Sequence, residues 1–289
     1  MSFDIFESIW ALLMAVCMVL TGFMDHGTPT VTKEAELVCE QKLLLDDAMY
    51  AGQGITTDGE YYYTSGSLTA FGIAGLAKWD AETMELVARN EDAIPEKYKE
   101  LYDSDHIGGI SYYDGKIYGA VENAEENFNL VVTYDCETLE IVDIYRMPAG
   151  DMLPDGIPWC AVDAENGYLY CAPFNETDCI YAFDLKTMEF SHTIGVSHTL
   201  TRIQGGEVYD GVLYLSNDVE NSNSDKVLAV DIATGEVTTL CTRNLPSLAG
   251  NEAEGLTVYP MDDGTLIHIL DYDKTVGVYV RHYKLTEAE

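Results

Sequence analysis

The chain has 289 residues and is 47% hydrophobic, so its composition is that of a folded protein with a sizeable core. Fifty acidic residues face fifteen basic ones, which gives a formal net charge of -35. A field of this sign repels phosphate groups and makes nucleic acid and anionic membranes poor partners, while it attracts cations and amine-bearing ligands.

Residues 1–30 differ from the rest of the chain. The apolar run from Ile9 to Gly22 is shorter than the ~20 residues of a membrane span and suits the hydrophobic part of a secretory signal peptide. Asp4 and Glu7 precede it without any Lys or Arg, so an uncleaved membrane anchor is the alternative. Both interpretations predict that the body of the protein is secreted or otherwise extracytoplasmic, with contact to a membrane only through this segment.

Residues 35–289 are expected to form one domain of imperfect repeats. A tight-turn dipeptide recurs between apolar, tyrosine-rich runs, at Asp58-Gly59, Asp114-Gly115, Asn166-Gly167, Asp210-Gly211 and Asp263-Gly264. Asp, Asn and Gly tolerate the positive φ angles of a type I′ turn, so each dipeptide predicts a β-hairpin.

A second motif, Asp-x-x-Thr between two apolar strands, follows four of these hairpins. Its aspartates are Asp80, Asp135, Asp184 and Asp231. Asp and Thr side chains at such positions bond to local backbone N–H groups and close a turn. Two hairpins per repeat give four strands in meander order, which is the blade of a propeller. The sequence therefore predicts an all-β, five-bladed β-propeller of four-stranded blades.

The last repeat is one strand short, whereas an extra strand, Ala35–Asp46, precedes the first hairpin. We expect this N-terminal strand to join the last blade and close the ring, which would leave no open edge. The connection from Asn90 to His106 is long, and Pro95 is placed to begin a turn of helix that covers one mouth of the ring.

Cys160 and Cys171 fall opposite each other if the hairpin around Asn166-Gly167 is regular. A disulfide and two buried free thiols are both compatible with that position.

The innermost strand of each blade lines the central channel of a propeller. Glycines are expected where these strands begin, because five strands converge there. Polar residues occur at the same places, and a core strand would not favour them. Gln53, Arg202, Gln204 and Glu252 are the candidate ligand-binding residues, with Trp159 as a stacking wall. Together they predict a polar, partly acidic cup at one mouth.

In an enzyme built on this cup, His106 and Glu254 would act as general acid and base. The alternatives are structural: His106 as a surface loop residue, Trp159 as core packing, and only one of Glu252 and Glu254 facing the channel. No cofactor motif occurs, although Ca²⁺ held in the channel by glutamate and backbone or amide oxygens suits this chemistry. The scattered histidines do not favour zinc.

Four strand starts resemble those of the glutamine cyclotransferase-like propellers, the plant and bacterial type of glutaminyl cyclase. The matching segments are Gln53-Gly54-Ile55, Trp159-Cys160-Ala161, Gln204-Gly205-Gly206-Glu207 and Glu254-Gly255-Leu256. The resemblance spans about residues 50–285 and implies five blades and the formation of N-terminal pyroglutamate from glutamine. Gly205 stands where that family has the first glutamate of the fourth start, and Glu207 matches the second.

The Asp-x-x-Thr repeats also resemble those of quinoprotein-like and YVTN-like surface-repeat propellers, which are often non-enzymatic. Three hypotheses follow: a binding propeller for a small polar or cationic ligand or a peptide end, an enzyme using the same cup, and a protein-interaction scaffold. The enzyme would be a cyclotransferase or a Ca²⁺-assisted lactonase or esterase.

Overall fold

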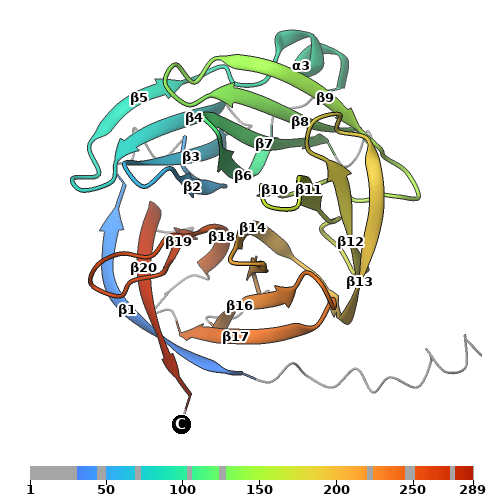
Figure 1. The fold of residues 1–289 in the computed structure, drawn as a ribbon. Helices are drawn as coiled ribbons and strands as arrows, with labels where there is room; N and C mark the ends of the chain where they lie inside the picture. Colours follow the sequence, from blue (N-terminus) through green and yellow to red (C-terminus); the bar gives the residue numbers. More distant parts are fainter. Residues whose placement is uncertain are drawn as a thin grey trace, which may run out of the picture.

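The computed structural model describes residues 31–43, 50–68, 73–102, 106–123, 128–219, 224–244, 251–273 and 277–288. They form a ring of five four-stranded antiparallel sheets, each with its strands in meander order (Figure 1). The predicted five-bladed propeller is therefore confirmed. The predicted leader, residues 1–30, lies outside the described residues. Within the described part of the chain, no helix has the length and apolar character to cross a bilayer.

The blades are numbered in chain order. Blade 1 has β2 (Ile55–Thr57), β3 (Tyr61–Leu68), β4 (Ile73–Asp80) and β5 (Leu86–Asn90). Blade 2 has β6 (His106–Tyr113), β7 (Lys116–Asn123), β8 (Phe128–Asp135) and β9 (Ile141–Met147). Blade 3 has β10 (Ala161–Asp163), β11 (Tyr168–Cys171), β12 (Thr177–Asp184) and β13 (Phe190–Leu200). Blade 4 has β14 (Ile203–Tyr209), β15 (Val212–Asn217), β16 (Ser224–Asp231) and β17 (Val237–Asn244). Blade 5 has β18 (Asn251–Val258), β19 (Ile267–Asp273) and β20 (Gly277–Glu287), and its fourth strand is β1 (Lys33–Lys42).

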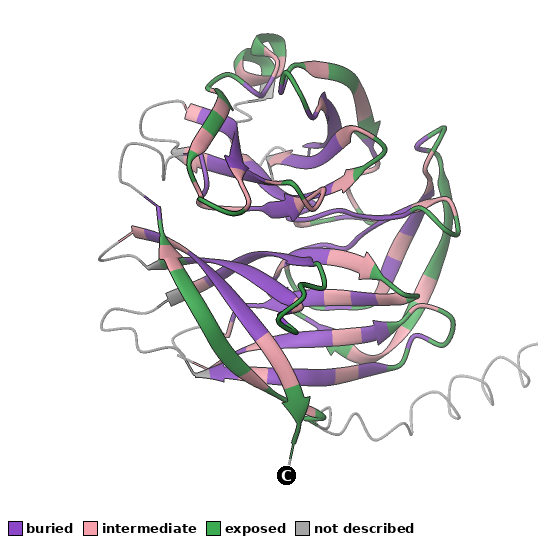
Figure 2. Ribbon diagram, turned by 60° about the vertical axis from the view of Figure 1, so that its left-hand side comes forward, coloured by how far each residue is buried: buried purple, intermediate pink, exposed green. Residues whose placement is uncertain are grey.

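Strand β1 closes the ring as predicted. It runs antiparallel to β20, with Ala35 opposite Leu285 and Lys42 opposite Tyr279. It begins slightly earlier than the predicted Ala35–Asp46 and ends at Lys42. Figure 2 shows β1 as an exposed outer strand lying against buried strands of the last blade. The two ends of the described chain are thus held in one sheet.

The Asp-x-x-Thr motif closes the outer hairpin of blades 1 to 4. In blade 2, Asp135 Oδ1 accepts hydrogen bonds from the backbone N–H of Thr138 at 2.8 Å and from its hydroxyl at 3.0 Å. The same two bonds recur at Asp80, Asp184 and Asp231. Because these bonds favour the carboxylate form, the pKa of each of these aspartates lies below its usual value.

The predicted type I′ turns occur in blades 2 and 4 only. Asp114 and Gly115 have φ angles of 49° and 75°, and Asp210 and Gly211 have 51° and 74°. In the other three blades only the glycine of the dipeptide has a positive φ, so the type I′ prediction was wrong there. In blade 1 the connection is longer, and Asp58 Oδ1 accepts the backbone N–H of Tyr61 at 2.7 Å. A side-chain acceptor thus stabilises a wider turn.

Five hydrophobic clusters form the core, one between each pair of neighbouring blades. The innermost strands approach each other directly at the axis. Gly255 donates its N–H to the carbonyl of Gln53 at 2.6 Å, and a Cβ atom on Gly205 would lie 2.7 Å from Gly255 Cα. The predicted need for glycine at the convergence of the strands is confirmed at these positions.

The connection between blades 1 and 2 contains the predicted helical turn, α3 (Glu96–Tyr102). Figure 1 places α3 at the outer rim of the ring, so it does not cover a mouth of the channel. Its Tyr98 packs against Phe128 of β8, with ring centroids 5.6 Å apart. Burying Tyr98 against blade 2 explains why the helix lies on the rim.

Cys160 and Cys171 are buried free thiols, so the disulfide alternative is not realised. Their neighbours Ala161 and Tyr170 are paired in the ladder, which confirms the expected register. Burial raises the pKa of both thiols. The two cysteines therefore serve as small core residues.

Candidate functional site

Strands β2, β6, β10, β14 and β18 surround the axis of the ring (Figure 1). The end at which these strands begin is called the start side here, and the end at which the first hairpin of each blade turns is called the turn side. The predicted site residues all belong to segments at the start side. Two polar groups form there, each joining two neighbouring blades.

The first group joins blades 1 and 2. His106 Nε2 lies 2.7 Å from Gln53 Oε1, a hydrogen-bond acceptor, so Nε2 carries the imidazole proton. Nδ1 then presents its lone pair to Glu122 Oε1, 3.6 Å away at the end of β7. Burial lowers the pKa of His106 to about 4 and raises the pKa of Glu122 to about 8. At neutral pH the pair is therefore a neutral imidazole beside a protonated carboxyl group.

The second group joins blades 4 and 5. Gln204 Nε2 donates to Glu252 Oε1 at 3.4 Å, and Arg202 Nη2 lies 3.8 Å from the same oxygen. Arg202 also forms an ion pair with the buried Asp218, to which its Nε donates at 3.0 Å. Gln204, Arg202 and Glu252 are thus brought together, as the sequence predicts for a cup.

Arg202 is held in an unusual backbone conformation, with a φ of 51°. Its N–H donates to the carbonyl of Phe174 at 2.8 Å, and its own carbonyl accepts the N–H of Asp218 at 3.1 Å. Its guanidinium carbon lies 5.1 Å from the centroid of the Phe174 ring. Because a non-glycine residue costs free energy in this region, these contacts must fix Arg202 firmly in place.

Glu254 and Trp159 occupy less accessible places. Glu254 is only 3% exposed, whereas Glu252 is half-buried and contacts Gln204. The two glutamates therefore have different surroundings. A register shift between Ala253 and Leu256 places Glu254 in a β-bulge. Trp159 is fully buried and packs in the core between blades 3 and 4, where a Cβ on Gly206 would lie 2.8 Å from its ring. Trp159 therefore lies in the core, as the structural alternative predicted.

Another carboxyl group, that of Glu207, lies where all five innermost strands meet. Glu207 of β14 accepts hydrogen bonds from Thr56 of β2 at 3.2 Å, Ser111 of β6 at 3.3 Å and Thr257 of β18 at 3.3 Å. Ser111 in turn accepts the N–H of Val162 of β10 at 3.1 Å, so all five blades meet around this carboxylate. Burial raises the pKa of Glu207 to about 8.

Sequence reasoning missed Glu122 and Asp218 as members of the cup. Both follow or end the second strand of a blade, which runs back to the start side. Counting strand direction would have placed them at that mouth, but a register shift between Ile107 and Ile110 is what sets Glu122 opposite His106 in the ladder. The sequence proposed Glu254 for this role, whereas the carboxyl group that lies beside His106 is that of Glu122.

A dedicated metal centre is not evident in this geometry. Among the described residues, no group of three or more His, Cys, Asp or Glu side chains is placed to hold an ion. Glu207 with its three hydroxyl neighbours offers one carboxylate, whereas Ca²⁺ takes six to eight oxygen ligands, usually including several carboxylates. Calcium in the channel stays a prediction.

The sequence matches no family model and no curated protein. Solved structures share the fold. A GH43_1 enzyme from Xanthomonas citri superposes with a TM-score of 0.57 at 11% identity, over 85% of this chain and 90% of that chain. The same enzyme complexed with xylose gives a TM-score of 0.55 at 11% identity, over 85% and 89% of the two chains.

Hydrazine synthase from Kuenenia stuttgartiensis gives a TM-score of 0.45 at 16% identity, and the alignment covers 83% of this chain and 64% of that chain. This chain therefore spans less than two thirds of the length of that protein. At 11% identity the likeness to the GH43_1 enzyme extends to the fold and not to chemistry. The glutaminyl cyclase-like family is not confirmed by these matches.

Proposed function

We propose that the protein is a ligand-binding propeller whose start-side cup takes a small polar ligand with an ammonium group, such as the free amino end of a peptide. One observation carries the proposal. Gln53, His106, Gln204 and Glu252 come from the starts of four different innermost strands and meet in two cross-blade polar contacts at one mouth. Convergent polar groups in a concave, mostly apolar setting are typical of ligand sites.

Charge supports a cationic ligand. Two carboxylates at this mouth, Asp218 and Glu252, lie beside one guanidinium, that of Arg202. The whole chain carries a formal net charge of -35, which raises the local concentration of cations. The neutral side chains Gln53, Gln204 and His106 add hydrogen-bonding groups that can orient the remainder of the ligand.

The binding test uses the dipeptide amide Gln-Ala-NH₂ and its N-acetylated form in isothermal titration calorimetry. We expect only the free-amine form to bind, because acetylation removes the ammonium group. Glu252→Gln should weaken binding about tenfold, the loss of one charge-assisted hydrogen bond. Glu140→Gln, the same change at an exposed turn, is the matched control. Equal binding of the acetylated peptide, or no binding of either form, would contradict the proposal and favour the scaffold hypothesis.

A second candidate is an enzyme using the same cup, favoured by the His106–Glu122 pair. Burial shifts the pKa values of these two groups in opposite directions, which is how one site acquires an acid and a base at one pH. Neutral His106 could accept a proton and Glu122 could donate one, beside a substrate amide oriented by Gln53. The test is the mass of the same peptide after incubation. Loss of ammonia, abolished by His106→Ala, would support a cyclotransferase, and an unchanged mass would leave a binding module.

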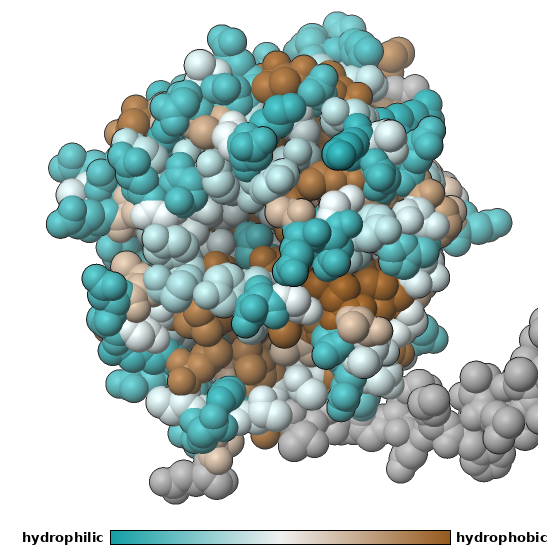
Figure 3. All heavy atoms as spheres, in the orientation of Figure 1, coloured by the Kyte–Doolittle hydropathy of each residue, from teal (hydrophilic) through white to brown (hydrophobic). Residues whose placement is uncertain are grey.

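We also propose that the protein is extracytoplasmic, on the strength of the apolar run in residues 1–30 and the acidic surface. Figure 3 shows that hydrophilic side chains cover most of the face seen there, with hydrophobic ones grouped in smaller areas. N-terminal sequencing of the protein recovered from outside the cell tests this. A mature chain beginning after about residue 22 would support a cleaved leader, whereas recovery in the cytoplasm would contradict it.

A further inference from the structure

A pocket of about 590 Å³ lies between blades 2 and 3, at the opposite end of the ring from the cup. Three turn-side connections line it: the β6–β7 turn, the β10–β11 turn and the β12–β13 turn. Its volume is within the range of about 300–1,000 Å³ that small-ligand sites occupy. Neither the cup nor the proposed function makes use of it.

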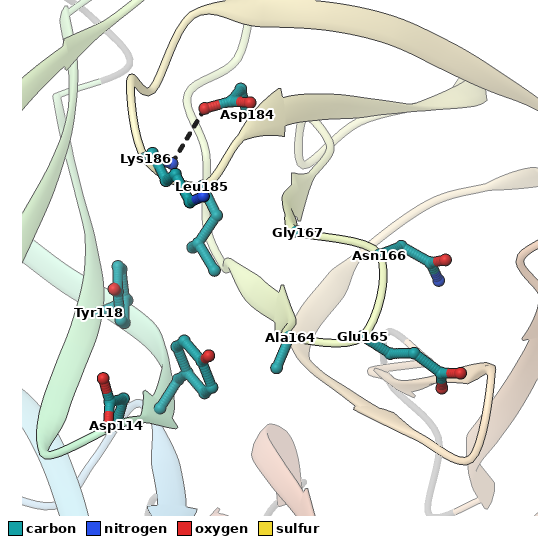
Figure 4. A pocket seen from close by; sticks show the side chains of 10 residues that line it. Asp114, Tyr118, Ala164, Glu165, Asn166, Gly167, Asp184, Leu185 and Lys186 are labelled. Atoms are coloured by element: carbon teal, nitrogen blue, oxygen red, sulfur yellow. Dashed lines mark hydrogen bonds between the residues drawn. The ribbon is translucent and has the colours of Figure 1, made fainter.

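The walls of this turn-side pocket are aromatic and aliphatic. Tyr118 of blade 2 stands on one side, and Ala164 and Leu185 of blade 3 complete the lining opposite it (Figure 4). Tyr113 of blade 2 also lines the pocket. Tyr113 is 36% exposed and Tyr118 is 7% exposed, so Tyr113 is the more accessible of the two aromatic side chains that line the pocket. Leu185 and Tyr118 belong to one hydrophobic cluster, which fixes the wall.

A comparison of equivalent positions in three blades shows that the Tyr118 hydroxyl lacks the hydrogen-bond acceptor that the other two tyrosines have. The ladder pairs Tyr63 with Thr56, Tyr118 with Ser111, and Tyr170 with Ala161, so the three tyrosines occupy the same position in their blades. Tyr63 donates to Asp58 at 2.7 Å and Tyr170 donates to Asp163 at 3.1 Å.

In blade 2 the position of these aspartates is occupied by Tyr113. Among the described residues, the Tyr118 hydroxyl makes no hydrogen bond, although the side chain is more than nine-tenths buried and lines the pocket. Burial raises its pKa to about 12, so it stays a phenol and a hydrogen-bond donor at neutral pH. A ligand with an acceptor oxygen would satisfy it.

The rim of the pocket is acidic. The residues that line it include three acidic ones, Asp114, Glu165 and Asp184, and one basic one, Lys186. Asp184 Oδ1 accepts the backbone N–H of Lys186 at 3.0 Å and of Thr187 at 2.9 Å, which holds the aspartate in its ionised form. Tyrosine faces attract cations through the negative charge of the ring, and the surrounding carboxylates act in the same direction.

We infer that the turn-side pocket binds a small organic cation with a hydroxyl or carbonyl oxygen, of the alkylated ammonium class. The cation lies on the Tyr113 ring within the acidic rim, and the oxygen accepts the Tyr118 hydroxyl. This site is independent of the start-side cup, and either can fail without the other.

The test compares choline with 3,3-dimethylbutan-1-ol, which replaces the charged nitrogen by carbon and keeps the shape and the hydroxyl. Calorimetry on the full chain should show choline binding about tenfold more tightly than the alcohol, the size of a cation–π contact with charge support. Tyr113→Ala should weaken choline about tenfold, and Tyr118→Phe should weaken it by a smaller factor.

Blade 4 provides matched controls, because it repeats the turn sequence as Tyr209-Asp210-Gly211 with Tyr214 at the Tyr118 position. Tyr209→Ala and Tyr214→Phe should leave choline binding unchanged. The exposure of Tyr113 makes its truncation compatible with folding, and an unchanged unfolding midpoint checks this.

Three results would overturn the inference. Equal affinity for choline and the alcohol would show that the positive charge of the ligand does not contribute to binding. Binding lost in Glu252→Gln and kept in Tyr113→Ala would place the cation in the cup instead. Binding of D-glucose in the absence of choline binding would make the pocket a carbohydrate site.

Discussion

Replacing Glu207 with glutamine tests how the centre of the ring is held. The carboxylate accepts hydroxyl hydrogen bonds from Thr56, Ser111 and Thr257, at 3.2 to 3.3 Å, from strands of three other blades. Glutamine has the same shape, accepts through its oxygen and donates through its nitrogen. Each hydroxyl can reverse its role, so the variant retains a bonded centre without a titrating group.

The magnitude follows from the shift of the pKa of Glu207 from an ordinary 4.5 to about 8 on burial. Between these values the native state holds a proton that the unfolded state releases. Wild-type stability therefore falls as pH rises through this window, by about 1.4 kcal/mol per pH unit and about 5 kcal/mol in full. The glutamine variant lacks this slope, so the difference in unfolding free energy should shift toward the variant by up to about 5 kcal/mol as pH rises from 4.5 to about 8.

Urea unfolding of both proteins at pH 5, 7 and 9 measures the effect. Glu122 titrates in the same direction, whereas the lowered pKa values of His106 and His282, about 4, weaken the protein below pH 6.5. The contributions of these three residues to the pH dependence are the same in both proteins, so they cancel in the difference of the unfolding free energies. A difference that stays flat between pH 5 and 9, or that increasingly favours wild type as pH rises, would refute the reasoning. Glu140→Gln, at an exposed turn, should give a flat difference.

Three further changes test the architecture by urea unfolding. Gly205→Ala should lose about 2 kcal/mol, because its Cβ would press on Gly255 Cα at 2.7 Å, whereas Gly195→Ala, with nothing within 4 Å, should change stability little. Equal losses at both glycines would contradict the close approach at the axis. Asp271→Asn should cost about 3 kcal/mol, because it leaves the fully buried Arg243 without the carboxylate that it contacts at 2.8 Å. The exposed pair of Lys116 and Asp143, 3.6 Å apart, gives the comparison, and Asp143→Asn should cost below about 1 kcal/mol. Asp135→Ala should cost about 1 kcal/mol through the loss of its bonds to Thr138, and Thr138→Val should lose part of the same free energy; additive losses in the double variant would show that the bonds are not shared.

The sequence by itself determined the number of blades, the order of their strands and the closing strand. These features depend on local chemistry: an Asp that bonds to the N–H groups two and three residues on, and a Gly that accepts a positive φ. Asp135 and Thr138 form their turn through residues adjacent in the chain, so the pattern can be read directly. The type I′ prediction was wrong at Asp58-Gly59, and the cause is also local: the Asp58 side chain accepts a backbone N–H and stabilises a wider turn.

Tertiary structure decided which polar residues meet. His106 faces Glu122, which lies on the neighbouring strand of the same blade, whereas Glu254 turns inward at a β-bulge that no motif announces. Trp159 looked like a wall of the cup, but packing between blades 3 and 4 takes its ring into the core. Tyr118 carries the same side chain as Tyr63 and Tyr170 but has Tyr113 in place of their aspartate partner, and only the structure shows that both tyrosines line a pocket between two blades. Whether a side chain binds, packs or stays free depends on the blade beside it, and that neighbour is fixed only when the ring closes.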